Sequence, residues 1–409
     1  MSLKPAKTIS PQDWMISPES RLLFSALEGG ESKDQPVALF VGGCVRNALL
    51  NLPVEDVDLA TSLKPEAVIK RLENAGITVI PTGLKHGTVT AIINRLPFEI
   101  TTLRHDVETD GRHAVVEFTD NWLEDARRRD FTMNTLLADP KGNIYDPTGQ
   151  GLPDLALRRI RFVGEAKKRI EEDYLRILRF FRFHAIYSLG EFDQDALRAC
   201  SEAAGKIATL SRERITQEVF KIVASDRPNK ILSIMFENNI LKELDHAEYE
   251  PDFLESFCTF QKNYGLISLP SRLYVQAGLK DENISGLESL ILFPKVFLKD
   301  MQALSGALTL PDLSCDHAVK VCIYRFGRVI AAQALMVELV QDRVMNGYAP
   351  KALDIVQNWD IPDFPVTGND LMKAGIPQGP QLGKKLQEFE DWWIGDGFRA
   401  DKKTCLRHL

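Results

Sequence analysis

The order of apolar and polar positions predicts alternating strands and helices in the first third of the chain. The apolar run 37–41 ends at Gly42–Gly43, which is typical of a buried strand that enters a glycine turn. Acidic and apolar residues alternate over 55–60, and this period of two predicts a strand with one polar face. The other elements expected here are a helix over 45–50, a helix over 65–76, and strands over 88–93 and 98–103 joined by a turn at 94–97.

Helical periodicity replaces the strand patterns beyond residues 146–154, a segment rich in glycine, proline and aspartate. We place a domain boundary there. The clearest helical stretches that follow are 169–185, 212–224, 230–238 and 329–340. The pattern therefore predicts an α+β fold class, in which an α/β head precedes a long helical body.

Composition places the chain among globular proteins: its 409 residues are 44% hydrophobic and 26% charged. This length exceeds what one core usually supports and predicts roughly two to four domains. No stretch approaches the ~18 apolar residues that a membrane span needs. The first residues lack the apolar segment of a secretory signal, so we expect a cytoplasmic protein. The six cysteines form no CxxC pair, which favours reduced thiols over disulfides or a zinc site.

Two aspartates, Asp56 and Asp58, stand two residues apart in the second predicted strand. A period of two puts both carboxylates on one face, and such a pair suits Mg²⁺ bound together with substrate phosphates. For an isolated pair of this kind, a solvated strand edge is the ordinary alternative. The glycines upstream favour the metal, because Gly42 and Gly43 let backbone N–H groups approach a phosphate, with Arg46 close by.

A third carboxylate is left open between Glu99 and Asp130. Glu99 lies in the last predicted head strand, where an ordinary exposed position is an equal alternative. Asp130 follows three consecutive arginines, residues 127–129, and can hold one of them in an ion pair.

Charged residues recur every three positions in the predicted helix 169–185. Asp173, Arg176 and Arg179 share one face, with Arg182 just beyond. A ladder of surface ion pairs is one interpretation. The other is base recognition, because a carboxylate accepts from the exocyclic amine of cytosine or adenine while an arginine donates to ring nitrogen or carbonyl acceptors. Such a couple would reject U and G by leaving buried polar groups unpaired.

Several motifs occur in the order found in a known family. They are Gly42-Gly-Cys-Val-Arg46-Asn, Asp56-Val-Asp58, Arg128-Arg-Asp-Phe-Thr-Met-Asn134 and Glu172-Asp-Tyr-Leu-Arg176-Ile-Leu-Arg179, followed by Leu210-Ser-Arg-Glu-Arg-Ile-Thr-Gln-Glu218. Together they resemble the class II tRNA nucleotidyltransferases, the CCA-adding enzymes related to bacterial poly(A) polymerases. The resemblance is dense from about residue 36 to 222, and the sequences of the motifs are similar to those of mitochondrial and α-proteobacterial members.

This resemblance implies a polymerase-β-like nucleotidyltransferase head followed by an all-helical neck, body and tail in a seahorse shape. The corresponding boundaries are 1–150, 151–225, 226–330 and 331–409. The body and tail would hold the acceptor and TΨC arms of tRNA. The implied reaction is template-independent addition of C, C and A to the tRNA 3′ end from CTP and ATP, by two-metal transfer with release of pyrophosphate.

The resemblance also implies roles for single residues. It implies that Asp56 and Asp58 bind Mg²⁺ and that Gly43 and Arg46 bind the triphosphate. Positions that contact the nucleotide match Arg129, Arg179 and Arg182, and the base-reading pair matches Asp173 and Arg176.

Two features bear on which member of the family this is. Asn47 stands where the family usually has Asp, and because Asn keeps one acceptor we expect tuning rather than inactivity. Residues 106–113 resemble the flexible head loop that complete CCA addition needs. The alternatives that stay open are a poly(A) polymerase, a CC-only or A-only enzyme, and an inactive RNA-binding relative.

Charge is unevenly distributed along the chain. The total is −7, from 50 basic and 57 acidic residues, which taken alone argues against a nucleic-acid partner. Residues 158–182 nevertheless carry nine basic and four acidic side chains, a local +5, so the remainder carries −12. Because screening hides charges beyond ~8–10 Å, we expect a confined RNA-binding face with an acidic back.

Overall fold

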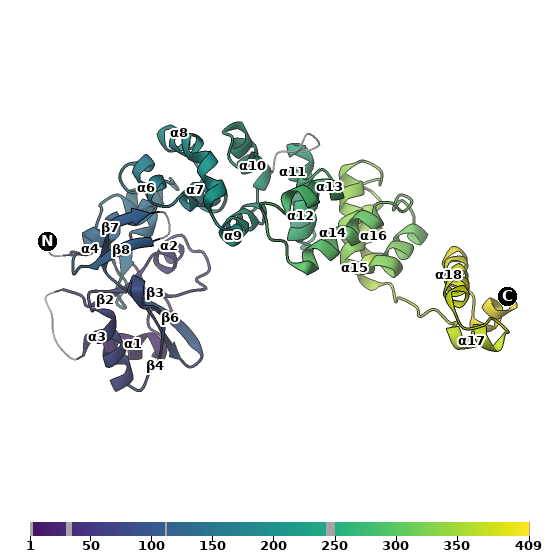
Figure 1. Ribbon diagram of the computed structural model, residues 1–409, viewed down its shortest axis with the longest axis horizontal. Coiled ribbons are helices and arrows are strands. Elements are labelled where there is room, and N and C mark those ends of the chain that lie inside the picture. The colour runs from purple at the N-terminus through teal and green to yellow at the C-terminus, as the bar shows by residue number, and fades with distance from the viewer. Residues whose placement is uncertain (1–2, 30–34, 111–112, 243–249, 409) are drawn as a thin grey trace. The chain divides into compact units, whose positions relative to one another are not determined.

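The computed structural model describes residues 3–29, 35–110, 113–242 and 250–408 (Figure 1). The chain divides into two compact units, 1–243 and 244–409. In the described ranges, no helix is both long and apolar enough to cross a membrane.

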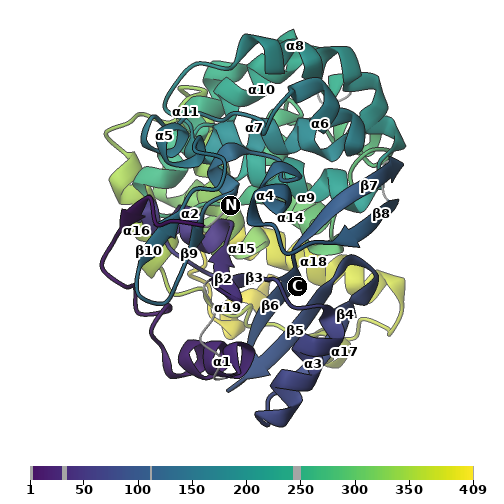
Figure 2. The same cartoon turned by 90° about the vertical axis from the view of Figure 1, so that its left-hand side faces the viewer.

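An eight-stranded mixed sheet forms the centre of the first unit (Figure 2). Its order is β1-β10-β9-β2-β3-β6-β5-β4, in which β3 and β6 run parallel and the other neighbours antiparallel. These strands are β1 (Lys7–Thr8), β2 (Ala38–Val41), β3 (Asp58–Thr61), β4 (Thr78–Gly83), β5 (Thr88–Ile93), β6 (Leu96–Thr102), β9 (Leu137–Ala138) and β10 (Asn143–Tyr145). A separate pair consists of β7 (Arg104–Asp110) and β8 (His113–Phe118).

Helices α1 (Pro18–Glu28) and α3 (Pro65–Asn74) lie side by side against this sheet (Figure 2). α1 begins where the Ser17 hydroxyl accepts from the Ser20 N–H at 3.1 Å, with proline in the first turn. Inside, the Phe40 ring of β2 contacts the rings of Trp14 and Phe24, each at a centroid distance of 4.8 Å. All four residues of β2 are buried, so this packing holds the strand that leads into the glycine turn.

The remaining elements described in the first unit are helices, and several of the later ones pack on α7 (Leu175–Tyr187). The α7 rings of Phe180 and Phe183 are buried, and they lie 5.3 Å from Phe162 and 4.6 Å from Phe131. These aromatic contacts join α7 to two earlier segments of the chain, those around residues 131 and 162. The other helices are α2 (Gly43–Leu49), α4 (Trp122–Arg127), α5 (Gly151–Ala156), α6 (Ala166–Glu172), α8 (Gln194–Ala203), α9 (Arg212–Val223) and α10 (Pro228–Glu237), with the 3₁₀ turns η1 (Leu84–His86), η2 (Thr132–Asn134) and η3 (Ala204–Thr209).

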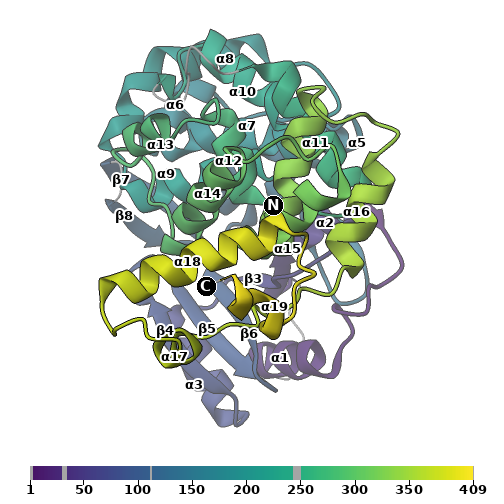
Figure 3. The ribbon, with the colours of Figure 1, turned by 90° about the vertical axis from the view of Figure 1, so that its right-hand side faces the viewer.

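In its described residues the second unit consists of helices joined by loops, without strands (Figure 3). Its long helix α15 (Asp316–Val340) is interrupted at Gly327, whose φ of 82° suits glycine. Near the chain end, α17 (Gly368–Lys373), α18 (Pro380–Gly395) and α19 (Lys402–Arg407) surround the buried Trp393. The others are α11 (Pro251–Asn263), α12 (Leu269–Gln276), α13 (Asp281–Leu287), α14 (Lys295–Ala307) and α16 (Ala349–Asn358).

The predicted order of an α/β head followed by helices is confirmed. The strands expected at 37–41 and 88–93 and the helix expected at 65–76 are confirmed within two residues. The turn between β5 and β6 is tighter than predicted. Asn94 and Arg95 alone form it, with φ of 51° and 69°, and such a two-residue turn matches the twist of the strands. The boundaries at 150, 225 and 330 stay predictions.

The prediction of one continuous helix over 169–185 is wrong. α6 ends at Glu172 and α7 begins at Leu175, and between them Asp173 has an extended backbone with φ −157° and ψ 107°. The Asp173 carboxylate accepts a hydrogen bond from the Leu175 N–H at 3.1 Å, which offers the backbone an alternative to continuing the first helix. Asp173 therefore does not share a helix face with the α7 arginines.

Candidate active site

The turn between β2 and α2 brings two guanidinium groups against a pair of glycines. Gly42 has φ 73° and ψ −121°, a conformation that glycine alone adopts without strain. A Cβ on Gly42 would lie 3.8 Å from Arg129 Nη1, and one on Gly43 would lie 3.7 Å from Arg46 Nη2. The turn thus exposes backbone beside two positive charges, an arrangement suited to a phosphate.

Carboxylates gather at the start of β3. Asp58 is its first residue and pairs in parallel register with Glu99 of β6. Asp56 precedes the strand, so the prediction of a strand over 55–60 is right only from Asp58 onward. Burial, then Glu99 and Asp56, raise the pKa of Asp58 to about 6, while Arg129 lowers it. The three carboxylates therefore repel one another, and they lie close to Arg129, which is also beside Gly42.

These carboxylates suit a divalent cation that is bound jointly with the substrate better than a cation that is held by protein ligands alone. Within the part of the chain that the structure describes, no three His, Cys, Asp or Glu side chains are gathered closely enough to hold an ion. Mg²⁺ commonly takes one or two carboxylates and completes its shell with water and substrate phosphates. Burial is the main cause of the raised pKa of Asp58, and the repulsion from Glu99 and Asp56 that adds to it is one that a bound cation would relieve.

Asp130 is engaged by an arginine and not by the other carboxylates. It is buried, and its carboxylate accepts from the Arg179 guanidinium, from Asn134 Nδ2 at 2.9 Å and from the Phe131 N–H at 2.8 Å. Despite burial, these contacts, with Arg179 foremost, lower its pKa to about 2. A carboxylate so engaged positions Arg179, whereas Glu99 is the one beside Asp58.

Asp125 is a residue that the sequence reasoning missed. The Asp125 side chain is 3% exposed and holds two arginines: Oδ1 lies 2.7 Å from Arg128 Nη2, and Oδ2 lies 2.9 Å from Arg129 Nη2. Its Oδ1 also accepts from the Arg104 N–H at the start of β7. The spacing of three and four residues before the arginine pair was the signal that could have identified it.

The α7 arginines each have a separate carboxylate partner. Arg182 pairs with the buried Glu218 of α9, and Arg176 pairs with Glu172 at the end of α6. Arg176 also donates to two backbone carbonyls, those of Arg169 and Arg128. The predicted base-reading couple is therefore not an ion pair in this structure, because the Asp173 carboxylate pairs with Arg214 at 2.7 Å.

Arg46 of α2 lies in one cluster with Arg179 and Arg182 of α7. Its guanidinium donates to Asn47, Asn134 and Tyr187, and it lies over the Tyr187 ring at 4.1 Å. The guanidinium groups of Arg46, Arg179 and Arg182 lie 5.1, 5.6 and 4.7 Å from the centre of the Phe183 ring. The structure thus brings together most of the predicted residues, namely Gly42, Gly43, Arg46, Arg129, Asp130, Arg179 and Arg182, beside Asp58 and Glu99. Tyr187 is a partner that no sequence motif singled out, and Glu218 ends the 210–218 motif, for which no role was predicted.

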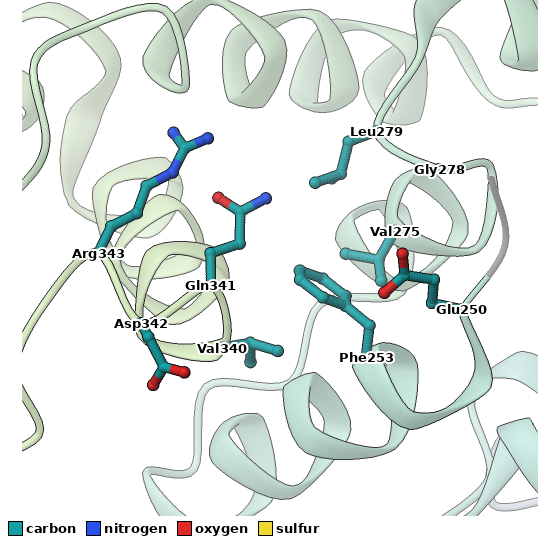
Figure 4. A pocket seen from close by; sticks show the side chains of 9 residues that line it. All are labelled: Glu250, Phe253, Val275, Gly278, Leu279, Val340, Gln341, Asp342 and Arg343. Carbon is teal, nitrogen blue, oxygen red and sulfur yellow. The ribbon is translucent and has the colours of Figure 1, made fainter.

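The predicted flexible loop 106–113 falls mostly in strands, since β7 extends to Asp110 and β8 begins at His113, and residues 111–112 are outside the described residues. A cavity of about 450 Å³ in the second unit is lined by apolar side chains such as Phe253 and Val340, with Gln341 and Arg343 at its edge (Figure 4). It contains none of the residues predicted from the sequence.

Two family models match segments of this chain, and curated proteins are similar to most of its length. The family model described as the Poly A polymerase head domain matches residues 38–161, and that described as a probable RNA and SrmB-binding site of polymerase A matches 191–247. CCA tRNA nucleotidyltransferase 1, mitochondrial, of Mus musculus is 34% identical over 96% of this chain and 92% of its own length. A CCA-adding enzyme of Streptococcus pyogenes is 34% identical over 86% of this chain and 87% of its own length.

Solved structures agree with this assignment. The Bacillus stearothermophilus CCA-adding enzyme in complex with CTP matches with a TM-score of 0.71 and 26% identity, over 93% of this chain and 94% of that one. The Thermotoga maritima CCA-adding enzyme complexed with tRNA shares the fold, with a TM-score of 0.65, 17% identity and 98% coverage of both chains. The chain therefore belongs to the family of CCA-adding tRNA nucleotidyltransferases, whose catalytic part is the poly(A) polymerase head domain.

Proposed function

We propose that this protein adds C, C and A to the 3′ end of tRNA, using CTP and ATP and releasing pyrophosphate. The observation that carries the proposal is the meeting of the Asp58–Glu99 carboxylates with the arginine-lined glycine turn. A turn that receives a triphosphate beside carboxylates that receive cations suits nucleotidyl transfer. The names of the relatives, and the CTP and tRNA in their structures, support the same substrates.

The triphosphate would be bound by the Gly42–Gly43 backbone together with Arg46 and Arg129. Asp125 fixes the Arg129 guanidinium through Nε and Nη2, so this arginine is oriented before any substrate arrives. Asp130 does the same for Arg179. Preorganised donors of this kind stabilise the charge that develops on the phosphates as pyrophosphate leaves.

Asp56 and Asp58 are the residues that would hold divalent cations, with Glu99 beside them, and we propose Mg²⁺. When bound, such ions lower the pKa of the tRNA 3′-hydroxyl and neutralise the leaving phosphates. The chain itself supplies the negative field, since the Asp58 pKa of about 6 reflects burial and two neighbouring carboxylates. The 3′-hydroxyl attacks the α-phosphorus directly, and no covalent enzyme intermediate is required.

Base selection would fall to the break between α6 and α7. Asp173 and Arg176 are partly exposed there, and each is held by its own partner, Arg214 for Asp173 and Glu172 for Arg176. A carboxylate acceptor and a guanidinium donor fixed separately can still match the edges of cytosine and adenine. Arg179 and Arg182, oriented by Asp130 and Glu218, would complete the nucleotide pocket.

The test supplies a tRNA lacking CCA with CTP, ATP or both, and sequences the 3′ ends of the products. We expect CC with CTP alone and CCA with both nucleotides. Long adenosine tracts would assign the protein to the poly(A) branch, and products stopping at CC or needing a CC end would assign it to the partial enzymes. No incorporation under any condition would favour an inactive RNA-binding relative. We also propose a cytoplasmic location, to be tested by cell fractionation, since several relatives are named mitochondrial.

A further inference from the structure

Arg46 is a buried cation whose hydrogen-bond partners are all neutral. It is 7% exposed. Its Nε and Nη2 donate to Asn47 Oδ1 at 3.1 and 2.9 Å, its Nη1 donates to Asn134 Oδ1 at 2.6 Å, and its Nη2 also donates to the Tyr187 hydroxyl at 2.7 Å. These contacts engage four of the five guanidinium N–H groups. In the described parts of the chain, no carboxylate forms an ion pair with Arg46.

The charges nearby leave Arg46 without compensation. Three guanidinium groups surround the Phe183 ring, and two of them have carboxylate partners: Arg179 has Asp130, and Arg182 has Glu218. The cluster therefore holds three cations and two anions. Burial lowers the pKa of Arg46, and the charges of Arg182 and Arg179 act in the same direction, while Tyr187 and the more distant charge of Asp130 oppose them. Buried charges in proteins are usually paired, so a surplus of one positive charge is unusual.

The surplus charge lies where a phosphate would approach. Arg46 Nη2 is 3.7 Å from the position of a Cβ on Gly43, so the guanidinium lies directly beside the glycine turn. Asn47 is the partner that decides its charge balance, because Asn47 Oδ1 receives two of the four hydrogen bonds. The Asn47 amide is itself oriented, since its Nδ2 donates to the Pro53 carbonyl at 2.8 Å.

We propose that Asn47 is a positioning residue that sets the affinity of this site for triphosphates, by orienting Arg46 without neutralising it. The substrate triphosphate then serves as the counter-ion of Arg46, in place of a carboxylate from the protein. Asn134 and Tyr187 share the orienting role, and the Tyr187 ring contributes a cation–π contact without adding negative charge. The inference rests on the proposed function, because it requires a nucleoside triphosphate at the glycine turn.

The test measures binding of CTP and of CMP to the full chain by calorimetry, without tRNA. Asn47→Asp keeps the shape and the acceptor but pairs Arg46 with a carboxylate, and it loses the donor to the Pro53 carbonyl, a loss that it shares with Asn47→Ala. We expect the Kd for CTP to rise about ten-fold, the size of effect that one close charge produces at a partly buried site. The Kd for CMP should rise about two-fold, since CMP carries fewer charges. Asn47→Ala, which loosens Arg46 without adding charge, should fall between wild type and Asn47→Asp for CTP.

Asn51→Asp is the matched control. It makes the same change of charge four residues away on an exposed turn, where φ of 55° tolerates Asp. Its Kd for CTP should stay within about two-fold of wild type, because exposed charges are screened. CTP binding that is unchanged in Asn47→Asp, or equal in Asn47→Asp and Asn47→Ala, would overturn the inference.

Arg46→Gln provides a second route that does not depend on whether Asn47→Asp folds. It removes the charge and should also weaken CTP binding about ten-fold, with a smaller effect on CMP. Undiminished CTP binding by Arg46→Gln would overturn the inference as well. A wild-type chain that binds no CTP would contradict the proposed function itself, whereas normal wild-type binding with an unaffected Asn47→Asp would contradict only the role of Asn47.

Discussion

Asp58 combines partial burial with two carboxylate neighbours, Glu99 and Asp56, and these raise its pKa. Removing one carboxylate from a repelling group relieves strain in the folded state, yet it deletes a ligand of the proposed metal site. We therefore expect Asp58→Ala and Asp56→Ala to lose nucleotide incorporation by on the order of 10³-fold or more. The melting temperature of either variant should not fall. Incorporation is followed by extension of a tRNA that lacks CCA.

The matched control is Glu66→Ala, which removes an exposed carboxylate at the start of α3 and should retain full activity. Chelation of divalent cations in the wild-type protein should stop incorporation, and added Mg²⁺ should restore it. Full turnover by either aspartate variant would refute the assignment of the metal ligands.

Asp125 is expected to matter for both stability and nucleotide binding, because one buried carboxylate holds Arg128 and Arg129. Asp125→Asn keeps the shape but leaves two partly buried guanidinium groups without their anion. We expect a loss of about 3 kcal/mol in the free energy of unfolding and a higher KM for CTP. Chemical denaturation and initial rates at varied CTP measure the two effects.

Asp195→Asn is the comparison for this prediction. Asp195 forms an ion pair of similar spacing with Arg198, but its side chain is 89% exposed. Such a pair contributes under about 1 kcal/mol, so neither stability nor KM should change measurably. Equal effects of the two substitutions would mean that Asp125 does no more than a surface charge.

Elements were predictable where one face of the chain is buried and local signals agree. The apolar run that became β2 ends in a glycine turn, and α3 carries proline in its first turn and glycine just beyond its end. The break between α6 and α7 was not predictable from periodicity, since the charges repeat every three residues across it. It depends on one local and one tertiary contact: Asp173 accepts from the Leu175 N–H two residues on and from Arg214 of α9, 41 residues away in sequence.

Asp173 has two separable functions at this break. Its Oδ1 holds the first turn of α7, and its Oδ2 pairs with Arg214. Asp173→Asn retains an oxygen acceptor and should preserve stability, whereas Asp173→Ala should lose about 1 kcal/mol, as for loss of a helix cap. Both variants should discriminate less between CTP or ATP and UTP or GTP, because neither presents the carboxylate.

Incorporation of each of the four nucleotides into tRNA lacking CCA, measured beside thermal melting, separates the two functions. Arg176→Ala should relax the choice among nucleotides in the same way. If Asp173→Asn discriminated as well as wild type while Asp173→Ala did not, Asp173 would act only by shaping α7.

At the scale of the whole molecule, counting charges in the sequence overstates the number of cations that are available to bind a nucleic acid. Residues 158–182 carry a net +5, but the Arg169, Arg176 and Arg182 side chains are engaged by Glu172 and Glu218. Lys167 is exposed, and no ion pair of Lys167 occurs among the residues that the structure describes. Attraction for RNA phosphates therefore depends on few side chains, and these are the ones that set its salt dependence.

We accordingly expect tRNA affinity to fall linearly on a logarithmic scale of salt concentration, with a slope of roughly 0.7–0.9 for each phosphate contact. The double substitution Arg159→Gln and Lys167→Gln removes two exposed cations of this segment and should reduce the slope by about one to two. Arg159 forms a long ion pair with Asp154, at 3.9 Å, and the Arg159 side chain is 47% exposed, so a phosphate can still reach it. The control pair, Lys64→Gln and Lys70→Gln, removes two exposed cations at and within α3 and should leave the slope unchanged. Filter binding of tRNA across a range of salt concentrations measures each slope. Because both pairs change the net charge of −7 equally, a difference between them reports where the cations lie. Equal slopes would instead mean that the RNA senses the total charge, and that no confined basic face exists.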